Sequence, residues 1–299
     1  MARLVAAVVA FGLAVGPGAG AARSHGALIL VDPSTDATVA TVQLSGEPLR
    51  VTYGAGAFWV VAPAAARVFR VDARTRAVEP FRVGREPFGA AVGGRALWIA
   101  DHDGFRVLRV DLATGRVSRT RDLGSPQLAL AYGRGYVWVI GADESLRRLD
   151  PRTLTVTATI PNVAKSVEGI EPSVAVGRGG IWVSDAVTRG VIRVNPRSLH
   201  VTRRWVVGGY GVAVGAPGVW SADGFSEVRR LEPGATGVGV RGNPVDVAVD
   251  GHGVWAAVRF GRALVRIDPQ AHRVAARIPL GREAVSVATG GNLVAVAVD

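Results

Sequence analysis

The sequence predicts an all-β fold, a seven-bladed β-propeller, because two short phrases recur along the chain at a nearly constant spacing. The first is a turn phrase, such as VDPSTDATV at 31–39, that lies between two apolar runs. Its leading polar residues are Asp32, Asp72, Asp111, Asp150, Asn195, Glu232 and Asp268. Successive copies are 40, 39, 39, 45, 37 and 36 residues apart, a period that suits a blade of four strands.

A tryptophan phrase, such as ALWIAD at 96–101, marks the other half of each unit. The runs between turns alternate apolar and polar residues, which indicates strands rather than helices. The tryptophans at this position are Trp59, Trp98, Trp138, Trp182, Trp220 and Trp255, and Leu293 replaces them in the last copy. Because the series repeats within a strand, we interpret it as core packing. Trp205 is out of phase with the series and is expected on a different strand.

Each unit is expected to hold four strands in the same order. An inner strand follows a start of the Gly-x-Pro type, as in GREPFGAAV (84–92), and a Gly-rich hairpin leads from it into the tryptophan strand. The third strand ends at the turn phrase, where Asp accepts backbone N–H bonds and Pro presets the next φ. The outer strand follows, and GVGVRG (237–242) is expected to form the least regular one. An insertion, PNVAKSVEGIEP (161–172), is expected to protrude with Lys165.

The two ends of the sequence complement each other. Residues 283–299 supply two strands, and residues 27–45 supply two more before the first complete unit. We therefore expect the N-terminal strands to pair into the C-terminal blade and close the ring, which removes open sheet edges. The prediction is one propeller domain over residues 27–299.

The first residues predict export. They contain Arg3, an apolar run from Leu4 to Val15, and an Ala-Gly-Ala cleavage site at 19–21, so residues 1–21 are interpreted as a signal peptide. The run of twelve residues is shorter than the about 20 that a transmembrane helix needs. The mature protein is expected in the periplasm, at the cell wall or outside the cell. The absence of cysteine excludes disulfides, thiolate metal sites and cysteine nucleophiles.

The chain carries a formal net charge of +11, with Lys165 as its only lysine. It has no run of five or more basic residues and few aromatic residues between the cations, so nucleic-acid binding is not expected. One strand position, two before the turn residue, holds Arg70, Arg109, Arg148, Arg193, Arg230 and Arg266. We interpret these arginines as stems packed between blades whose head groups meet surface acids. A ring of cations for an anionic ligand is the alternative.

Propeller topology sorts the candidate functional residues by face. The loops between second and third strands share one face with the connections between blades, and we call it the inter-blade face. The candidate ligand-binding residues on this face are Glu47, Glu86, Asp101, His102, Glu171, Asp185, Asp223, Arg259 and Glu283. His200, His252 and His272 fall on the opposite face, so a three-histidine metal site is not expected. No metal site, cofactor or catalytic motif is predicted.

The acids among these residues allow two interpretations. They line a mouth suited to a cation, a polar ligand or general acid–base work with His102. Alternatively, because the acids recur from unit to unit, they accept backbone N–H groups at turns. His102 does not recur, which favours a functional role for it.

Two longer phrases resemble a known family. LWIADHDGFRVLRVDLATGRV (97–117) and VWAAVRFGRALVRIDPQAHRV (254–274) resemble the YVTN-type, YncE-like β-propeller repeats of exported bacterial proteins. Trp stands where Tyr is common there, and Asp where Asn is. The resemblance covers residues 27–299 and implies the fold, while it leaves the loop chemistry open.

The chain is more distantly similar to the streptogramin B lyases, propellers that use His and Glu with a magnesium ion for a ring-opening elimination. That resemblance implies His102 with Glu86 or Glu171 as base candidates, although the Trp-Phe-Thr-Glu blade phrase of the lyases is absent.

We expect a monomeric, non-enzymatic propeller that binds a partner protein, an envelope polymer or a small ligand through the inter-blade face, because sequence variation is concentrated in those loops. A lyase-like elimination and polyanion binding by the arginine-rich rim are the alternatives.

Overall fold

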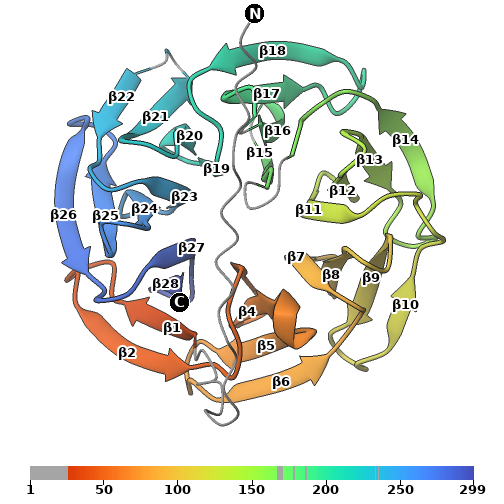
Figure 1. Cartoon of the computed structure of the whole chain (residues 1–299), viewed down its shortest axis with the longest axis horizontal. Helices are drawn as coiled ribbons and strands as arrows, with labels where there is room; N and C mark the ends of the chain where they lie inside the picture. The colour runs from red at the N-terminus through yellow and green to blue at the C-terminus, as the bar shows by residue number, and fades with distance from the viewer. Residues whose placement is uncertain (1–25, 167–170, 178, 186, 233, 235) are drawn as a thin grey trace, which may run out of the picture.

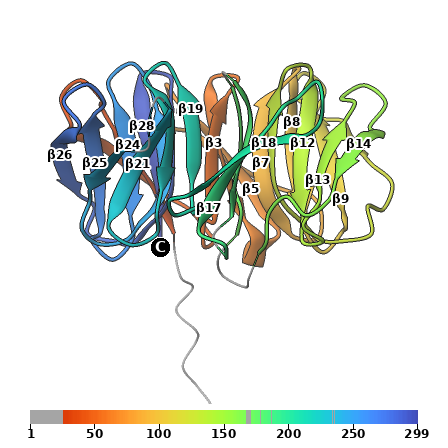
Figure 2. The same cartoon turned by 90° about the horizontal axis from the view of Figure 1, so that it is seen from above.

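The computed structural model describes residues 26–166, 171–177, 179–185, 187–232, 234 and 236–299. It confirms the predicted fold class: seven four-stranded antiparallel sheets form a ring (Figure 1). Figure 2 shows the ring from the side, with the strands running between its two faces. The predicted signal peptide, residues 1–21, lies outside the described residues.

The blades share one strand order from the central channel outward. The inner strands are β3 (Arg50–Gly54), β7 (Pro87–Gly93), β11 (Gln127–Gly133), β15 (Val174–Gly177), β19 (Val212–Gly215), β23 (Pro244–Val249) and β27 (Ala284–Gly290). The second strands are β4 (Ala57–Ala62), β8 (Ala96–Asp101), β12 (Tyr136–Gly141), β16 (Gly180–Asp185), β20 (Gly218–Ala222), β24 (Val254–Val258) and β28 (Leu293–Val298).

The third strands are β5 (Arg67–Asp72), β9 (Arg106–Asp111), β13 (Leu146–Leu149), β17 (Gly190–Val194), β21 (Glu227–Glu232), β25 (Ala263–Asp268) and β1 (Ala27–Val31). The outer strands are β6 (Val78–Arg82), β10 (Val117–Arg119), β14 (Val156–Ile160), β18 (Val201–Val206), β22 (Thr236–Gly239), β26 (Arg273–Pro279) and β2 (Thr38–Gln43). A single 3₁₀ turn, η1 (Pro63–Ala65), follows β4 among the described residues.

The ring closes as the sequence predicts. β1 pairs antiparallel with β28, from Ala27 opposite Val298 to Val31 opposite Val294, and β2 completes that blade. All five residues of β1 are buried, because the strand lies between β28 and β2 and is covered by both neighbouring blades. The first and the last strand that the structure describes therefore share one sheet. Its register places Ala295, and not Leu293 as the sequence predicts, at the tryptophan position of this blade.

Two parts of the propeller differ from the sequence expectation: strand β10 and the insertion at 161–172. β22 has four residues, as its glycines predicted, but β10 is shorter still, with three. In the insertion, residues 167–170 lie outside the described part of the chain. Its beginning does not protrude as expected, since Val163 and Ala164 are buried and the N–H of Val163 donates to the carbonyl of Glu144 (2.8 Å).

The tryptophans form the core between blades. All six of the series are at most 4% exposed on second strands that are themselves buried almost throughout. The indole N–H of Trp98, for example, donates to the carbonyl of Gly93 (3.0 Å), so the burial leaves no donor without a partner there. Trp205 lies on the outer strand β18 and packs against Trp182, with ring centroids 5.2 Å apart.

The arginines that share one strand position have a structural role. The guanidinium groups of Arg109, Arg193 and Arg266 lie 5.6–6.0 Å from the ring centres of the tryptophans beside them. Their head groups meet acids: Arg193 donates to Glu232 (2.9 Å), and Arg266 donates to Asp36 of the closing blade. This agrees with the interpretation of stems packed between blades.

The turn aspartates cap the turns that join third and outer strands. Asp72 Oδ1 accepts the backbone N–H of Arg74 (3.1 Å) and both the N–H and the hydroxyl of Thr75 (2.8 and 3.0 Å). These bonds, with the one from the Thr75 N–H the strongest, lower the pKa of Asp72 to about 2. Bonds of the same kind lower the pKa values of Asp32, Asp111, Asp150 and Asp268.

Acid is therefore expected to destabilise the propeller between about pH 4 and about pH 2. A carboxyl with a depressed folded pKa stabilises the fold when ionised; this contribution is present above the unfolded value of about 3.9 and is lost as the pH falls through the folded one. Asn195 makes the same turn bonds without a charge, to Arg197 and Ser198. Replacing Asp72, Asp111 and Asp150 together by Asn should flatten the melting temperature against pH, and an unchanged acid dependence would contradict this account.

Among the described residues, no helix has both the length and the apolar character needed to cross a bilayer.

Candidate functional site

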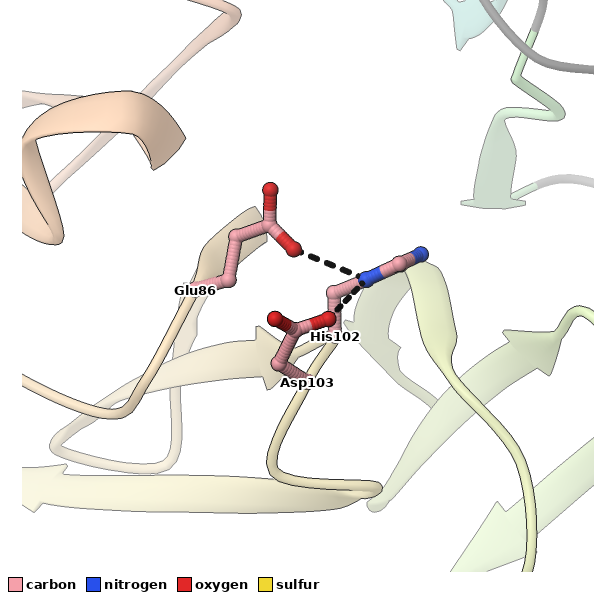
Figure 3. A group of neighbouring side chains, drawn as sticks. All are labelled: Glu86, His102 and Asp103. Atoms are coloured by element: carbon pink, nitrogen blue, oxygen red, sulfur yellow. Dashed lines mark hydrogen bonds and ion pairs between the residues drawn. The ribbon is translucent and has the colours of Figure 1, made fainter.

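One group of side chains on the inter-blade face stands apart from the repeat. Glu86 precedes β7, and His102 and Asp103 begin the loop from β8 to β9 of the same blade (Figure 3). His102 Nδ1 lies 2.8 Å from Glu86 Oε2 and 2.9 Å from Asp103 Oδ1. We call these three residues the His102 cluster.

The backbone holds the His102 cluster in place. The N–H of His102 donates to the carbonyl of Glu86 (2.9 Å), and the N–H of Phe105 donates to the carbonyl of His102 (3.1 Å), which closes a tight turn. The ring of Phe88 stacks on the imidazole with centroids 4.9 Å apart. Two backbone bonds and one aromatic contact therefore fix the imidazole, while more than a quarter of it stays exposed.

The carboxyl groups of the cluster differ in acidity. Burial raises the pKa of Glu86, although the neighbouring imidazole partly counters that effect. The hydrogen bond to His102 lowers the pKa of Asp103, whose side chain is 62% exposed. Asp103 is thus the more readily ionised of the two, and it faces solvent.

The donor set of the cluster suits a cation. One imidazole nitrogen and two carboxylate oxygens come within 4.8 Å of one another, and this is the only such group among the described residues. Mixed nitrogen and oxygen donors fit Zn²⁺ or Mn²⁺ better than Mg²⁺, which prefers oxygen ligands and water. A protonated amine or a guanidinium would meet the same two carboxylates.

Three of the predicted acids serve turns instead. Asp101 is 3% exposed, and its Oδ1 accepts the N–H groups of Arg85 (2.7 Å) and Glu86 (3.0 Å). Asp185 is 2% exposed and accepts the N–H of Thr188 (2.9 Å). Asp223 Oδ1 accepts three backbone N–H groups of its own loop. Their geometry follows the second interpretation, in which repeated acids satisfy backbone donors.

The remaining predicted residues lie elsewhere. Arg259 and Glu283 face each other at 3.9 Å beside the end of the chain. Glu47 is close enough to Asp299 to raise its pKa, an effect that comes second to burial. Glu171 lies at the central channel, where its carbonyl is 3.5 Å from Arg50 Nη2. Of the two base candidates, the structure therefore places Glu86, and not Glu171, in contact with His102.

The channel holds polar residues that sequence reasoning missed. A cavity of about 280 Å³ is lined by inner strands, among them β3, β23 and β27. Arg50 on β3 donates to the carbonyl of Pro172 (3.2 Å), ahead of β15, and so spans the channel between blades that are not neighbours. Asp246 on β23 accepts the hydroxyl of Ser286 (2.7 Å) and the N–H of Val287 (3.0 Å) on β27.

A sequence signal for the channel residues exists in retrospect. The strand registers place Arg50 and Asp246 at the inner-strand position that is occupied by Gly89 and Ala129 in other blades. A charged residue at a repeat position that otherwise holds small residues departs from the pattern. Asp103 was missed because it stands next to His102 without recurring in other units.

The fold is similar to that of a solved structure, the hydrazine synthase of Kuenenia stuttgartiensis. The TM-score is 0.61, and the match covers 82% of this chain and 90% of that chain at 16% sequence identity. The similarity is one of fold. No protein-family profile matches the sequence, and no curated protein shows significant similarity to it.

Two neighbouring aspartates of this loop should behave oppositely. Asp101→Ala is expected to lower the free energy of unfolding by about 1–3 kcal/mol, because the partly buried N–H groups of Arg85 and Glu86 lose their acceptor. Asp103→Ala is expected to change stability by no more than about 0.5 kcal/mol, since its side chain is largely exposed. Urea unfolding of both variants measures this contrast, and equal effects would contradict it.

Proposed function

We propose that the chain is an exported, non-catalytic binding propeller that holds a partner protein, an envelope polymer or a small ligand on its inter-blade face, with the His102 cluster contacting a cationic group of that ligand. The observation that carries the proposal is the cluster itself: two carboxylates flank one partly exposed imidazole at a position that no other blade repeats. The N-terminal sequence and the YVTN-like blade phrases support export.

Charge explains why this spot is selective. The chain carries a formal net charge of +11, so an acidic patch on it is a local exception that attracts a cationic group. The repeated aspartates add little to the attraction, because their carboxylate oxygens already accept hydrogen bonds from backbone N–H groups. Glu86 and Asp103 therefore supply the recognition, and His102 orients them.

Thermal-shift titration of residues 22–299 tests the proposal with defined probes: MnCl₂, ZnCl₂ and spermidine. A probe at 100 times its dissociation constant is expected to add about 2.7 kcal/mol of stability. Asp103→Asn and His102→Ala should remove the shift. Glu79→Gln, which neutralises an exposed carboxylate on the outer strand β6, should keep it. If the shift survived both cluster variants, the His102 cluster would not be the contact point.

A second candidate function is a lyase-like elimination. The observation in its favour is the 2.8 Å contact between His102 Nδ1 and Glu86, since a carboxylate that orients an imidazole is the usual arrangement of a general base. A magnesium ion would find two carboxylate oxygens here and would supply Lewis-acid polarisation. Opening of a streptogramin-type cyclic peptide by the parent, with none by His102→Ala, would establish this function. No opening by the parent would reject it.

A further inference from the structure

Exposed apolar side chains fall into two sets. One set is a valine that recurs on outer strands: Val39, Val78, Val117, Val156 and Val274. The other set lies on the inter-blade face, with Val206 at the end of β18 and with Phe105, Val187, Phe225 and Phe260 in loops between second and third strands. Val206, Phe260 and Phe225 are 85%, 70% and 51% exposed, the highest values outside the valine series.

These three residues come from three consecutive blades, which Figure 1 shows side by side. Backbone hydrogen bonds link their loops: the N–H of Val207 donates to the carbonyl of Arg189 (3.0 Å), and the N–H of Asn243 donates to the carbonyl of Phe225 (3.1 Å). The N–H of Arg259, next to Phe260, donates to the carbonyl of Asn243 (2.9 Å). The exposed residues thus belong to one connected surface.

Arginines are interspersed with the apolar side chains. The guanidinium of Arg189 lies 4.6 Å from the ring centre of Phe225. Arg241 and Arg262 are exposed in the adjoining loops of the next blade. Two acids lie two residues from Phe225, and both have partners: Asp223 Oδ1 accepts three backbone N–H groups of its own loop, and Glu227 pairs with Arg229. We call Arg189, Val206, Phe225, Arg241, Phe260 and Arg262 the Phe–Arg strip.

We propose that the Phe–Arg strip docks an acidic segment of a partner protein that carries aromatic or aliphatic side chains; this deepens the proposed function and rests on it. Aromatic residues and arginine are the side chains most enriched in protein interfaces, and arginine binds carboxylates through paired hydrogen bonds. A second copy of the chain is disfavoured as the occupant, because it also carries a formal charge of +11. The apolar side chains distinguish the strip from a surface for polyanions, which needs cations alone.

The test is selection of a random dodecapeptide display library on immobilised residues 22–299. The expected winners combine several Asp or Glu residues with at least one Trp, Phe or Leu. For a labelled synthetic winner, the double variant Phe225→Ala/Phe260→Ala is expected to raise the dissociation constant at least about tenfold in fluorescence anisotropy. The double variant Arg189→Gln/Arg262→Gln should weaken binding and reduce its dependence on salt.

The matched control is Phe105→Ala. Phe105 is a 38% exposed phenylalanine of the corresponding loop beside the His102 cluster, and this variant should bind like the parent. Thermal melts verify that each variant is folded.

The outcomes separate this inference from the proposed function. Selected peptides that no longer bind the strip variants but still bind His102→Ala support the strip and place the contact away from the His102 cluster. Winners that depend on His102 and not on the strip overturn the inference and leave the proposed function standing. The inference would also be overturned if no peptide were enriched, or if the enriched peptides lacked acidic residues. A third contradicting result is binding of heparin with the same affinity by the parent and by Phe225→Ala/Phe260→Ala.

Discussion

A variant without residues 26–45 is expected to lose cooperative folding. The deletion removes β1, in which Leu28, Ile29, Leu30 and Val31 are at most 5% exposed. Burying each such side chain contributes about 1.5–3 kcal/mol, so the loss is roughly 6–12 kcal/mol, as large as the whole stability of an ordinary domain. It also exposes β28 as an unpaired edge that invites aggregation.

A permuted control separates lost contacts from a shorter chain. Ala27 lies opposite Val298 in the closing blade, so residues 26–45 can follow Asp299 through a short glycine-containing hairpin. The permuted chain, beginning at residue 46, keeps every strand pair and should regain a single thermal transition. A cooperative melt of the deleted protein at the parent's temperature would show that closure contributes little.

Asp246→Ala is expected to lower the free energy of unfolding by about 3 kcal/mol or more. Asp246 accepts the hydroxyl of Ser286 and the N–H of Val287 on Oδ2, and the N–H of Val247 on Oδ1 (2.9 Å). Ser286 Oγ in turn accepts the N–H of Val51 (3.2 Å), so one carboxylate ties together three blades. Each donor left without an acceptor costs about 1–3 kcal/mol.

Ser286→Ala is the matched control for this network, because it removes the hydroxyl and leaves the carboxylate with its backbone donors. A cost of about 1–2 kcal/mol is expected for it in urea unfolding. Burial raises the pKa of Asp246, so its contribution is fully present below the unfolded value of about 3.9 and is lost as the pH rises through the folded one. The free energy by which the parent is more stable than Asp246→Asn should therefore decrease with rising pH. If the free energy of unfolding of Asp246→Ala lay within about 1 kcal/mol of the parent's, Asp246 would not link the three blades as described.

The fold could be predicted from the sequence because each blade repeats the same local physics. Asp at the start of the turn bonds to residues that are near in sequence, and tryptophan on the second strand packs against the next repeat, so both recur with one period. The short length of β10, by contrast, could not be predicted from the sequence. The strand ends where its pairing with β9 ends, after Arg119. The residues SRTRDL (118–123) do not indicate this end point.

The site could be predicted only in part. The sequence placed His102 and Glu86 on one face, because the topology of a blade brings loop starts together. It did not show that Asp101 turns inward onto backbone N–H groups while Asp103, two residues on, faces solvent. Nor could it place Arg50 against Pro172, since that contact crosses the channel between blades far apart in sequence.

The pairing of β1 with β28 also orders the events of biogenesis. The partners are roughly 260–270 residues apart, and at about 5–20 residues per second the ribosome needs roughly 13–54 seconds to make the chain between them. Throughout that interval β1 has no β28 to pair with, so the completed ring cannot form on the ribosome before the final strand emerges. Six blades are contiguous in sequence and can form as the chain emerges, whereas the seventh is assembled only when the C-terminal residues have been made.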